Sequence, residues 1–200
     1  MNLTRTKRRW LERCCRWVAI VVLAITPATA MAQASDEHDI YDARIEGYAS
    51  TCDAYHRVQM DPDGVEIVRC IETALDRAQR SPEEIGYINY HGTSTQLNDR
   101  IEAQCVRRVF GKHADRVPGS STKSMIGHPQ GASGAAGVAA TALALTHGVL
   151  PPTINLDDPD PACEMDFIPN VSRTGDVDAA LCNCLGFGSK NSALVLGRAR

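Results

Sequence analysis

Two histidines and a lysine stand in short segments that are otherwise rich in small residues. His91 opens "HGTST" at 91–95, and Lys123 and His128 lie within "STKSMIGHPQGASGAAG" at 121–137. A neutral imidazole donates one hydrogen bond, and two such donors aimed at one carbonyl oxygen stabilise negative charge that develops there. A nearby ammonium group keeps both imidazoles uncharged. This set suits chemistry through an enolate, including loss of CO2 from a β-keto acid thioester. It suits hydrolysis poorly, because no nucleophile is in view.

A third segment of this kind is "LGFGSKN" at 185–191. All three segments follow apolar stretches typical of strands, and ligands of layered α/β sheets gather at strand ends, so we expect the three to converge. A single histidine is more often an ordinary core or surface residue than a catalyst. We expect that ordinary role for four histidines: His38, His56, His113 and His147. The small residues around His91 and His128 favour a catalytic role for those two.

The apolar spacing predicts an α/β layered domain. Strands are expected at 40–50, 85–88 and 163–170, with a final hairpin at 179–188 and 191–198. Helices are expected at 64–80, at 131–147, and from a cap at Asn98 or Asp99 to Phe110. Residues 117–128 are expected to form a short strand that breaks into a loop. The 131–147 segment has no polar face, so as a helix it must be buried on most sides.

Charge and cysteine spacing exclude two classes of protein. Residues 1–16 carry six Lys or Arg and one Glu, so the remaining chain has a net charge of −8 within a total of −3. An acidic body argues against binding of nucleic acid. The eight cysteines form no CxxC pair, which argues against a disulfide framework or a zinc site, and we expect reduced thiols and no metal. Cys182 and Cys184 should face one side of a strand.

Residues 1–34 resemble an export signal, with a basic start, a short apolar run and small residues before a possible cleavage point. The run at 17–26 is too short to span a bilayer, which takes about 20 residues. Three interpretations follow: a signal peptide, an amphipathic anchor on a membrane surface, or a start that does not belong to the folded domain.

Several longer motifs occur together in this chain. They are "NYHGTSTQLND", "SSTKSMIGHPQGASGAAG", "PPTINLDDPDP", "DFIPN", "CNCLGFGSKN" and "CDAYH". In this order they resemble the C-terminal half of β-ketoacyl-acyl-carrier-protein synthases, the condensing enzymes of fatty-acid and polyketide synthesis. The resemblance covers residues 40–200. It implies a thiolase-like fold, in which this chain is one half of a five-layer αβαβα architecture.

The resemblance also implies roles for individual residues. His91 and His128 would bind the malonyl thioester carbonyl and assist decarboxylation, Lys123 would organise them, and Glu102 would be a structural acid near the lysine. Enzymes of this family use no resident cofactor, because the phosphopantetheine arm arrives on the acyl carrier protein.

The remaining implied roles concern the substrate channel. Thr93 and Thr95 would bond the phosphopantetheine arm, and Phe187 would gate the acyl pocket in a turn freed by Gly186 and Gly188. His56 and Asp53 would lie on a neighbouring loop at the pocket mouth.

The chain departs from the family pattern at several points. No cysteine stands in the small-residue motif that carries the family's nucleophile. Ser189 replaces a second glycine, Lys190 stands where threonine is common, and Gly137 replaces a glutamate that would pair with Lys123. Without the other half of the fold, we expect much of the 131–147 helix to face water.

We therefore expect the C-terminal portion of a β-ketoacyl-acyl-carrier-protein synthase, an acyltransferase by family that is inactive in condensation by itself. Its partners would be acyl carrier protein and a complementary N-terminal half or homodimer partner. The segment 1–34 would then be an accident of truncation or of gene calling, and the protein cytoplasmic. Two alternatives remain: a residual decarboxylase or carrier-protein-binding partner that acts with a separate N-terminal half, and an exported or membrane-associated binding protein without acyl chemistry.

Overall fold

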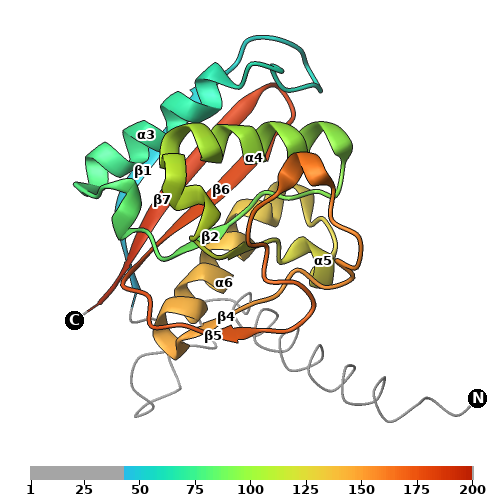
Figure 1. The fold of residues 1–200 in the computed structure, drawn as a ribbon. Coiled ribbons are helices and arrows are strands. Elements are labelled where there is room, and N and C mark those ends of the chain that lie inside the picture. Colours follow the sequence, from blue (N-terminus) through green and yellow to red (C-terminus); the bar gives the residue numbers. More distant parts are fainter. Residues whose placement is uncertain (1–42, 200) are drawn as a thin grey trace, which may run out of the picture. The chain divides into compact units, whose positions relative to one another are not determined.

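The computed structural model describes residues 43–199 and centres on one mixed sheet (Figure 1). The segment at 1–34, with its three interpretations, lies outside the described residues. The sheet has five strands in the order β1-β7-β6-β2-β3. Their bounds are Ala43–Cys52 for β1, Lys190–Arg198 for β7, Ala179–Gly186 for β6, Tyr87–Asn89 for β2 and Gly119–Ser120 for β3. No helix within 43–199 is both long and apolar enough to cross a bilayer.

The strand directions bring three loops to one edge of the sheet. Strand β2 runs parallel to both β3 and β6, with Asn89 opposite Ser120 on one side and Cys182 on the other. Strands β6 and β7 form an antiparallel hairpin, and β1 pairs with β7. Because parallel strands end on the same edge, the segments after β2, β3 and β6 all leave from that edge. All three segments therefore start at one edge of the sheet, as predicted, but only the first two line the cavity described below.

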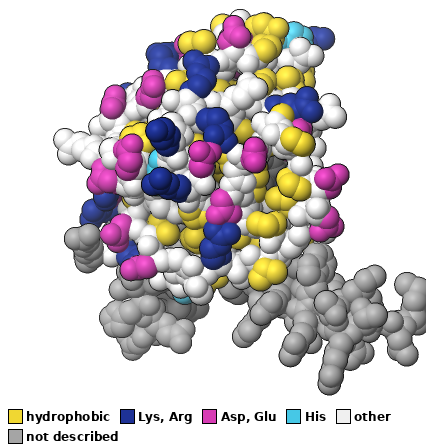
Figure 2. Space-filling view, viewed as in Figure 1, with side chains coloured by type: hydrophobic (Ala, Val, Ile, Leu, Met, Phe, Trp, Pro, Cys, Tyr) yellow, Lys and Arg dark blue, Asp and Glu magenta, His cyan; other side chains and the backbone are white. Residues whose placement is uncertain are grey.

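Helices cover both faces of this sheet. Helices α3 (Val65–Ala78) and α4 (Gln96–Phe110) share a hydrophobic cluster with Leu181 of β6, and α6 (Ser133–His147) shares another with Ala180 and Cys182. Successive residues of a strand point to opposite faces, so these two clusters lie on opposite sides of β6. On the surface shown in Figure 2, acidic and basic side chains are intermingled rather than separated.

Helix α6 lies close to the sheet because its contact residues are small. A Cβ atom at Gly137 would lie 2.9 Å from Cys182 Sγ, and one at Gly134 would lie 3.7 Å from Cys184 Sγ. Both cysteines therefore face α6, as their alternation predicts. Nine of the helix's 15 residues are buried, so the expectation that much of its surface faces water is wrong.

Several predicted boundaries also need correction. Helix α4 begins at Gln96 with Thr95 as N-cap, not at Asn98 or Asp99, because Thr95 already has the extended backbone (φ −110°, ψ 138°) of an N-cap. Residues 163–170 form no strand, because Ile168 and Asn170 have positive φ values of 46° and 60°. Lys123–Ile126 forms the short helix α5 where a loop was expected.

The remaining elements are short. Two-residue strands β4 (Val149–Leu150) and β5 (Arg173–Thr174) pair with each other. The 3₁₀ turns are η1 (Pro82–Glu84), η2 (Gly111–Asp115), η3 (Gln130–Ala132) and η4 (Pro161–Cys163). Turn η1 begins with a capping box: Ser81 precedes Pro82, and the Glu84 carboxylate accepts the Ser81 backbone N–H at 2.8 Å.

Candidate active site

The rings of His91 and His128 lie together in the folded chain. Their centroids are 5.5 Å apart and the ring planes meet at 80°. His91 follows β2 after one intervening residue, whereas His128 follows α5. The two imidazoles thus come from separate loops that the sheet edge brings to one place.

Local hydrogen bonds fix which nitrogen of His128 carries its proton. The Gln130 backbone N–H donates to Nδ1 of His128 at 3.0 Å, and the Ser133 hydroxyl lies 3.1 Å from the same atom. Because Nδ1 accepts a backbone proton, the neutral ring must carry its own proton on Nε2. Nε2–H is then the group that His128 can offer to a ligand.

His91 is held uncharged by its surroundings. The side chain is 5% exposed, and within the described residues its Nδ1 is buried without a hydrogen-bond partner. Burial, assisted by Lys123 and His128, lowers the pKa of His91 to about 3. Burial and Lys123 also lower the pKa of His128. Both rings can therefore act as neutral hydrogen-bond donors near pH 7.

Lys123 is the cation of this group. Burial lowers its pKa, whereas the carboxylate of Glu102 opposes that shift. Glu102 contributes only electrostatic attraction, because within residues 43–199 no hydrogen bond or ion pair to the Lys123 ammonium occurs. The ammonium is therefore available to a ligand.

Glu102 fastens the histidine loop to the protein interior. Its carboxylate accepts the backbone N–H groups of His91 at 2.8 Å and Gly92 at 2.9 Å. It also accepts from the side-chain amides of Asn98 at 3.4 Å and Asn183 at 3.3 Å. Burial raises the pKa of Glu102, and the two backbone N–H groups oppose that shift. This carboxylate links the loop after β2 to α4 and β6.

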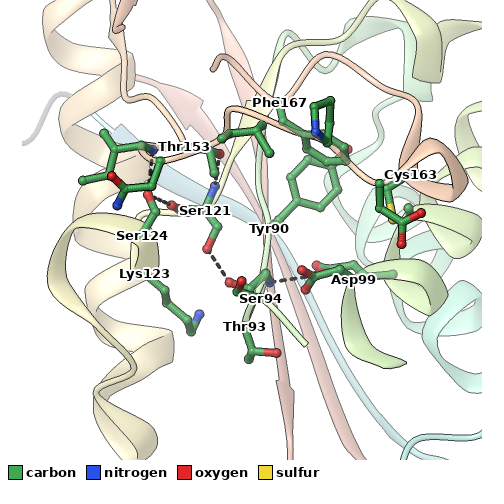
Figure 3. A pocket seen from close by; sticks show the side chains of 18 of the residues that line it. Tyr90, Thr93, Ser94, Asp99, Ser121, Lys123, Ser124, Thr153, Cys163 and Phe167 are labelled. Atoms are coloured by element: carbon green, nitrogen blue, oxygen red, sulfur yellow. Dashed lines mark hydrogen bonds between the residues drawn. The ribbon is translucent and has the colours of Figure 1, made fainter. Parts of the chain in front are cut away.

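A cavity of about 390 Å³ adjoins the group. Figure 3 shows Lys123, Thr93 and Asp99 around its polar part and Tyr90 and Phe167 at its apolar part. Glu102 and His128 also line it, but His91 does not. Burial raises the pKa of Asp99. The cavity thus combines charged and hydroxyl groups at one end with an aromatic wall at the other.

The two threonines predicted to bind the pantetheine arm lie side by side. Their hydroxyl oxygens are 2.9 Å apart. Thr93 lines the cavity, whereas Thr95 does not, because Thr95 caps α4.

The predicted gate lies apart from the cavity. Phe187 is 80% exposed in the turn between β6 and β7 and does not line the cavity. Gly188 has a positive φ of 80°, which fits the predicted need for backbone freedom, whereas Gly186 is not among the residues with positive φ. Asp53 and His56 lie beside this turn, where the Asp53 side chain accepts from Asn191 at 2.6 Å.

Three residues that shape the site were not singled out from the sequence. They are Gln130, Ser133 and Asn183. One signal was available for Asn183: an amide inside an otherwise apolar strand needs buried partners. Gln130 acts through its backbone N–H and Ser133 through its hydroxyl, and residue spacing does not show that both meet the ring of His128.

Comparison with known proteins identifies the family. Residues 42–157 match the model described as "Beta-ketoacyl synthase, C-terminal domain". The chain belongs to the β-ketoacyl synthase family. It is 47% identical over 156 residues to the tetracenomycin polyketide synthase ketoacyl synthase alpha subunit of Streptomyces glaucescens, covering 78% of this chain and 37% of that one. It is 43% identical over 156 residues to 3-oxoacyl-[acyl-carrier-protein] synthase 2 of Coxiella burnetii, covering 78% and 38%.

Solved structures agree with this assignment. A type II polyketide synthase acyl-carrier protein in complex with its ketosynthase matches with a TM-score of 0.77 and 38% identity, over 80% of this chain and 39% of that one. A β-ketoacyl synthase from Burkholderia phymatum matches with a TM-score of 0.74 and 35% identity, over 80% and 38%. The predicted thiolase-like half fold is confirmed. This ketosynthase chain spans less than two fifths of the length of these relatives.

Proposed function

We propose that residues 40–200 form the decarboxylating half of a β-ketoacyl-acyl-carrier-protein synthase. The observation that carries this proposal is the pair of neutral imidazoles, 5.5 Å apart between centroids, beside the Lys123 ammonium. The site would bind the carbonyl oxygen of a malonyl thioester and stabilise the enolate that forms when CO2 leaves.

The proposed reaction begins with the thioester oxygen between His91 and His128. The bond from the α-carbon to the carboxylate breaks, its electron pair forms the enolate, and CO2 departs. The Nε2–H of His128 donates to the developing oxyanion, and His91 supplies the second donor. Removal of one pre-aligned donor of this kind lowers the rate about 10²–10³-fold.

Neutral histidines matter in this scheme. An imidazolium could surrender its proton to the enolate and quench the carbanion before it attacks. The Lys123 charge and burial together oppose that protonated form. Lys123 thus holds both rings in the donor state and adds positive potential where charge develops.

Condensation would require an acylated cysteine. In the family this thioester receives the enolate carbon, the new C–C bond forms, and the thiolate leaves. No cysteine of these 200 residues stands in the family's nucleophile motif, so we assign the thiol to the N-terminal half of such a synthase or to a partner subunit. The chain alone is then expected to decarboxylate without condensing.

Acyl carrier protein is the proposed source of the substrate. One structural relative was solved with its acyl-carrier protein, and Thr93 and Thr95 lie where hydroxyls could bond the phosphopantetheine arm. The scheme uses no resident cofactor. We place the reaction in fatty-acid or polyketide synthesis in the cytoplasm.

The test is decarboxylation of malonyl carrier protein by the 200-residue chain, followed as acetyl carrier protein by mass spectrometry. His91→Ala and His128→Ala should each lower the rate about 10²–10³-fold. His147→Ala is the matched control, because His147 is an exposed histidine at the end of α6. Equal rates for all four chains would contradict the proposal.

A second measurement adds a separately produced N-terminal half from a relative, together with an acyl donor. Condensation should appear only in the mixture. Condensation by the 200-residue chain alone would show that one of its own thiols accepts the acyl group.

A further inference from the structure

A serine joins the two segments that carry His91 and His128. Strands β2 and β3 stay paired up to a backbone bond in which the Tyr90 N–H donates to the Ser120 carbonyl at 2.9 Å. Beyond this bond the two backbones separate, because Gly92 has a φ of 42° and leaves the sheet. There the Ser121 hydroxyl donates to the Gly92 carbonyl at 2.7 Å. A side chain thus continues the contact where the backbone ladder ends.

The two segments approach closely at this bond. A Cβ atom at Gly92 would lie 2.5 Å from Ser121 Cβ and 2.8 Å from Ser121 Oγ, so a glycine is needed to leave room for the serine. Ser121 is buried, with 8% of its surface exposed. Within residues 43–199, its hydroxyl makes the only hydrogen bond between the segments 91–95 and 121–128. No second bond duplicates this link.

The backbone of Ser121 is held on its other side. Its N–H donates to the Thr153 hydroxyl at 3.1 Å, and its carbonyl accepts the Ser124 hydroxyl at 2.8 Å (Figure 3). The Ser124 hydroxyl also accepts the Ile154 N–H at 3.0 Å. The two neighbouring segments therefore exchange hydroxyl contacts, each satisfying a backbone N–H of the other. These contacts give Ser121 a fixed place from which to hold its partner.

A short path leads from Ser121 to each imidazole. Helix α5 follows Ser121 after one residue, and a backbone bond of 2.9 Å closes its end at Gly127, the residue before His128. On the other side, His91 directly precedes Gly92. The bond between Ser121 and Gly92 therefore lies one residue from one ring and one helical turn from the other.

We propose that Ser121 is a positioning residue: its hydroxyl bridges the segments 91–95 and 121–128 and sets the distance between the two imidazole rings. Two donors must converge on one oxygen, and a bond between their segments fixes that convergence before substrate arrives. This inference rests on the proposed function for its catalytic meaning. The bridge itself belongs to the free chain and can be tested without substrate.

The first test compares the contact between the rings by NMR. In the unmodified 200-residue chain, ring centroids 5.5 Å apart should give a nuclear Overhauser cross-peak between ring protons of His91 and His128. In Ser121→Ala, the two segments lose their link, and a displacement of about 1 Å should lower the cross-peak to less than about half. The reason is that its intensity falls steeply with the distance between the protons.

Ser124→Ala is the matched control. It removes a hydroxyl from the same segment, but the Ser124 backbone N–H still donates to the Ser121 carbonyl at 3.2 Å, and the bond from Ser121 to Gly92 remains. The cross-peak should keep its intensity in this variant. An unchanged cross-peak in Ser121→Ala would overturn the proposal. An equal loss in both variants would also overturn it, because a general loosening of the segment would then be the cause.

The second test links the bridge to the reaction. With malonyl carrier protein as substrate, Ser121→Ala should lower kcat for decarboxylation about tenfold or more and leave KM nearly unchanged, because the substrate still binds while the donors are misaligned. An unchanged kcat despite a weakened cross-peak would overturn the positioning role. Absence of decarboxylation by the unmodified chain would instead contradict the proposed function, and the NMR comparison would still decide whether Ser121 holds the rings together.

Ser121→Cys keeps both tests decisive if Ser121→Ala does not fold. The thiol takes up a similar volume but donates only a weak hydrogen bond. We therefore expect the same changes to a smaller degree: a cross-peak weaker than in the unmodified chain and a lower kcat. Full cross-peak intensity and full kcat in Ser121→Cys would overturn the proposal.

Discussion

Two loops leave the same edge of the sheet and are held by opposite means. The histidine loop after β2 is fixed from within, by the fully buried carboxylate of Glu102 and the four N–H groups it accepts. The Phe187 turn after β6 is fixed at the surface, by the neutral hydroxyl of Ser189. A buried charge is costly to leave without partners, whereas a neutral hydroxyl costs less to leave unpaired, even though Ser189 itself is buried.

The difference suits what each loop would do. A pair of donors for an oxyanion must not move, because misplacement by a fraction of an ångström reduces transition-state stabilisation. A gate must open, so a fastening of modest strength is sufficient. We therefore expect the same edge of one sheet to carry a rigid element and a releasable one.

The largest expected effect comes from the fastening of the rigid loop. Glu102→Ala leaves the backbone N–H groups of His91 and Gly92 and the side-chain amide of Asn183 without their acceptor, whereas the Asn98 amide keeps Asp99 as an acceptor at 2.9 Å. We expect the free energy of unfolding to fall by about 3–5 kcal/mol, measured by urea denaturation. Asp115→Ala is the control, because that carboxylate forms only an exposed ion pair with Arg107 at 2.5 Å and should cost less than about 1 kcal/mol. If both variants lost a similar free energy of unfolding, the buried carboxylate would contribute no more to stability than an exposed ion pair.

The second prediction concerns the uncharged state of His91. Its folded pKa of about 3 lies below the unfolded value near 6.5, so the unfolded state binds the extra proton between these pH values. Above about pH 6.5 the His91 ring is neutral in both states, so its lowered pKa costs the fold nothing. As the pH falls from about 6.5 toward 3, the unfolded chain takes up a proton that the folded chain does not, and the free energy of unfolding decreases. At pH 5 the His91 contribution should be about 2 kcal/mol smaller than at pH 7.

Urea denaturation at pH 7 and pH 5 measures this dependence. The side chain of Asn cannot titrate. In His91→Asn, the free energy of unfolding should therefore fall by about 2 kcal/mol less between pH 7 and pH 5 than it does in the unmodified chain. His113→Asn is a control at a histidine outside the site, whose Nε2 contacts the Ile85 carbonyl at 3.0 Å. An identical pH dependence in the unmodified chain and His91→Asn would show that the His91 ring is not held neutral by folding.

Much of the rigid loop could be predicted from residue types, and little of the releasable one. Strand ends, small residues and the motifs around His91 and His128 indicated that the two rings would meet, and they do. The sequence also indicated which residue accepts the hydrogen bonds of this loop, since Glu102 was expected as a structural acid. Its four donors were not, because they come from three elements that only the folded chain brings together.

The Phe187 turn shows the limit of sequence interpretation. The glycines around Phe187 predicted backbone freedom at two positions, but a positive φ occurs at Gly188 and Ser189, not at Gly186. The left-handed backbone of Ser189 is accompanied by tertiary hydrogen bonds to His56, 133 residues away in the chain. Local propensity cannot show such a contact.

The third prediction concerns helix α6, which packs closely on β6. A Cβ at Gly137 would lie 2.9 Å from Cys182 Sγ and 3.3 Å from Asn89 Oδ1, so Gly137→Ala should destabilise the fold by about 1–3 kcal/mol. Gly134→Ala, on the same helix with its nearest atom at 3.7 Å, should be neutral or stabilising by up to about 1 kcal/mol. Thermal denaturation separates the two. If Gly137→Ala were as stable as Gly134→Ala, close packing of α6 on β6 would not be required.

The smallest expected change in stability is at Phe187. Its ring is 80% exposed, so Phe187→Ala should alter the free energy of unfolding by less than about 0.5 kcal/mol, measured by urea denaturation. The control is Phe110→Ala: that ring is 2% exposed in the core under α4, and its loss should cost about 3–5 kcal/mol. An exposed ring that contributes almost nothing to folding is consistent with the gate role that the family resemblance implies for Phe187. If Phe187→Ala instead cost as much as Phe110→Ala, the ring would be a packing element, and the contrast between a rigid loop and a releasable turn would fail.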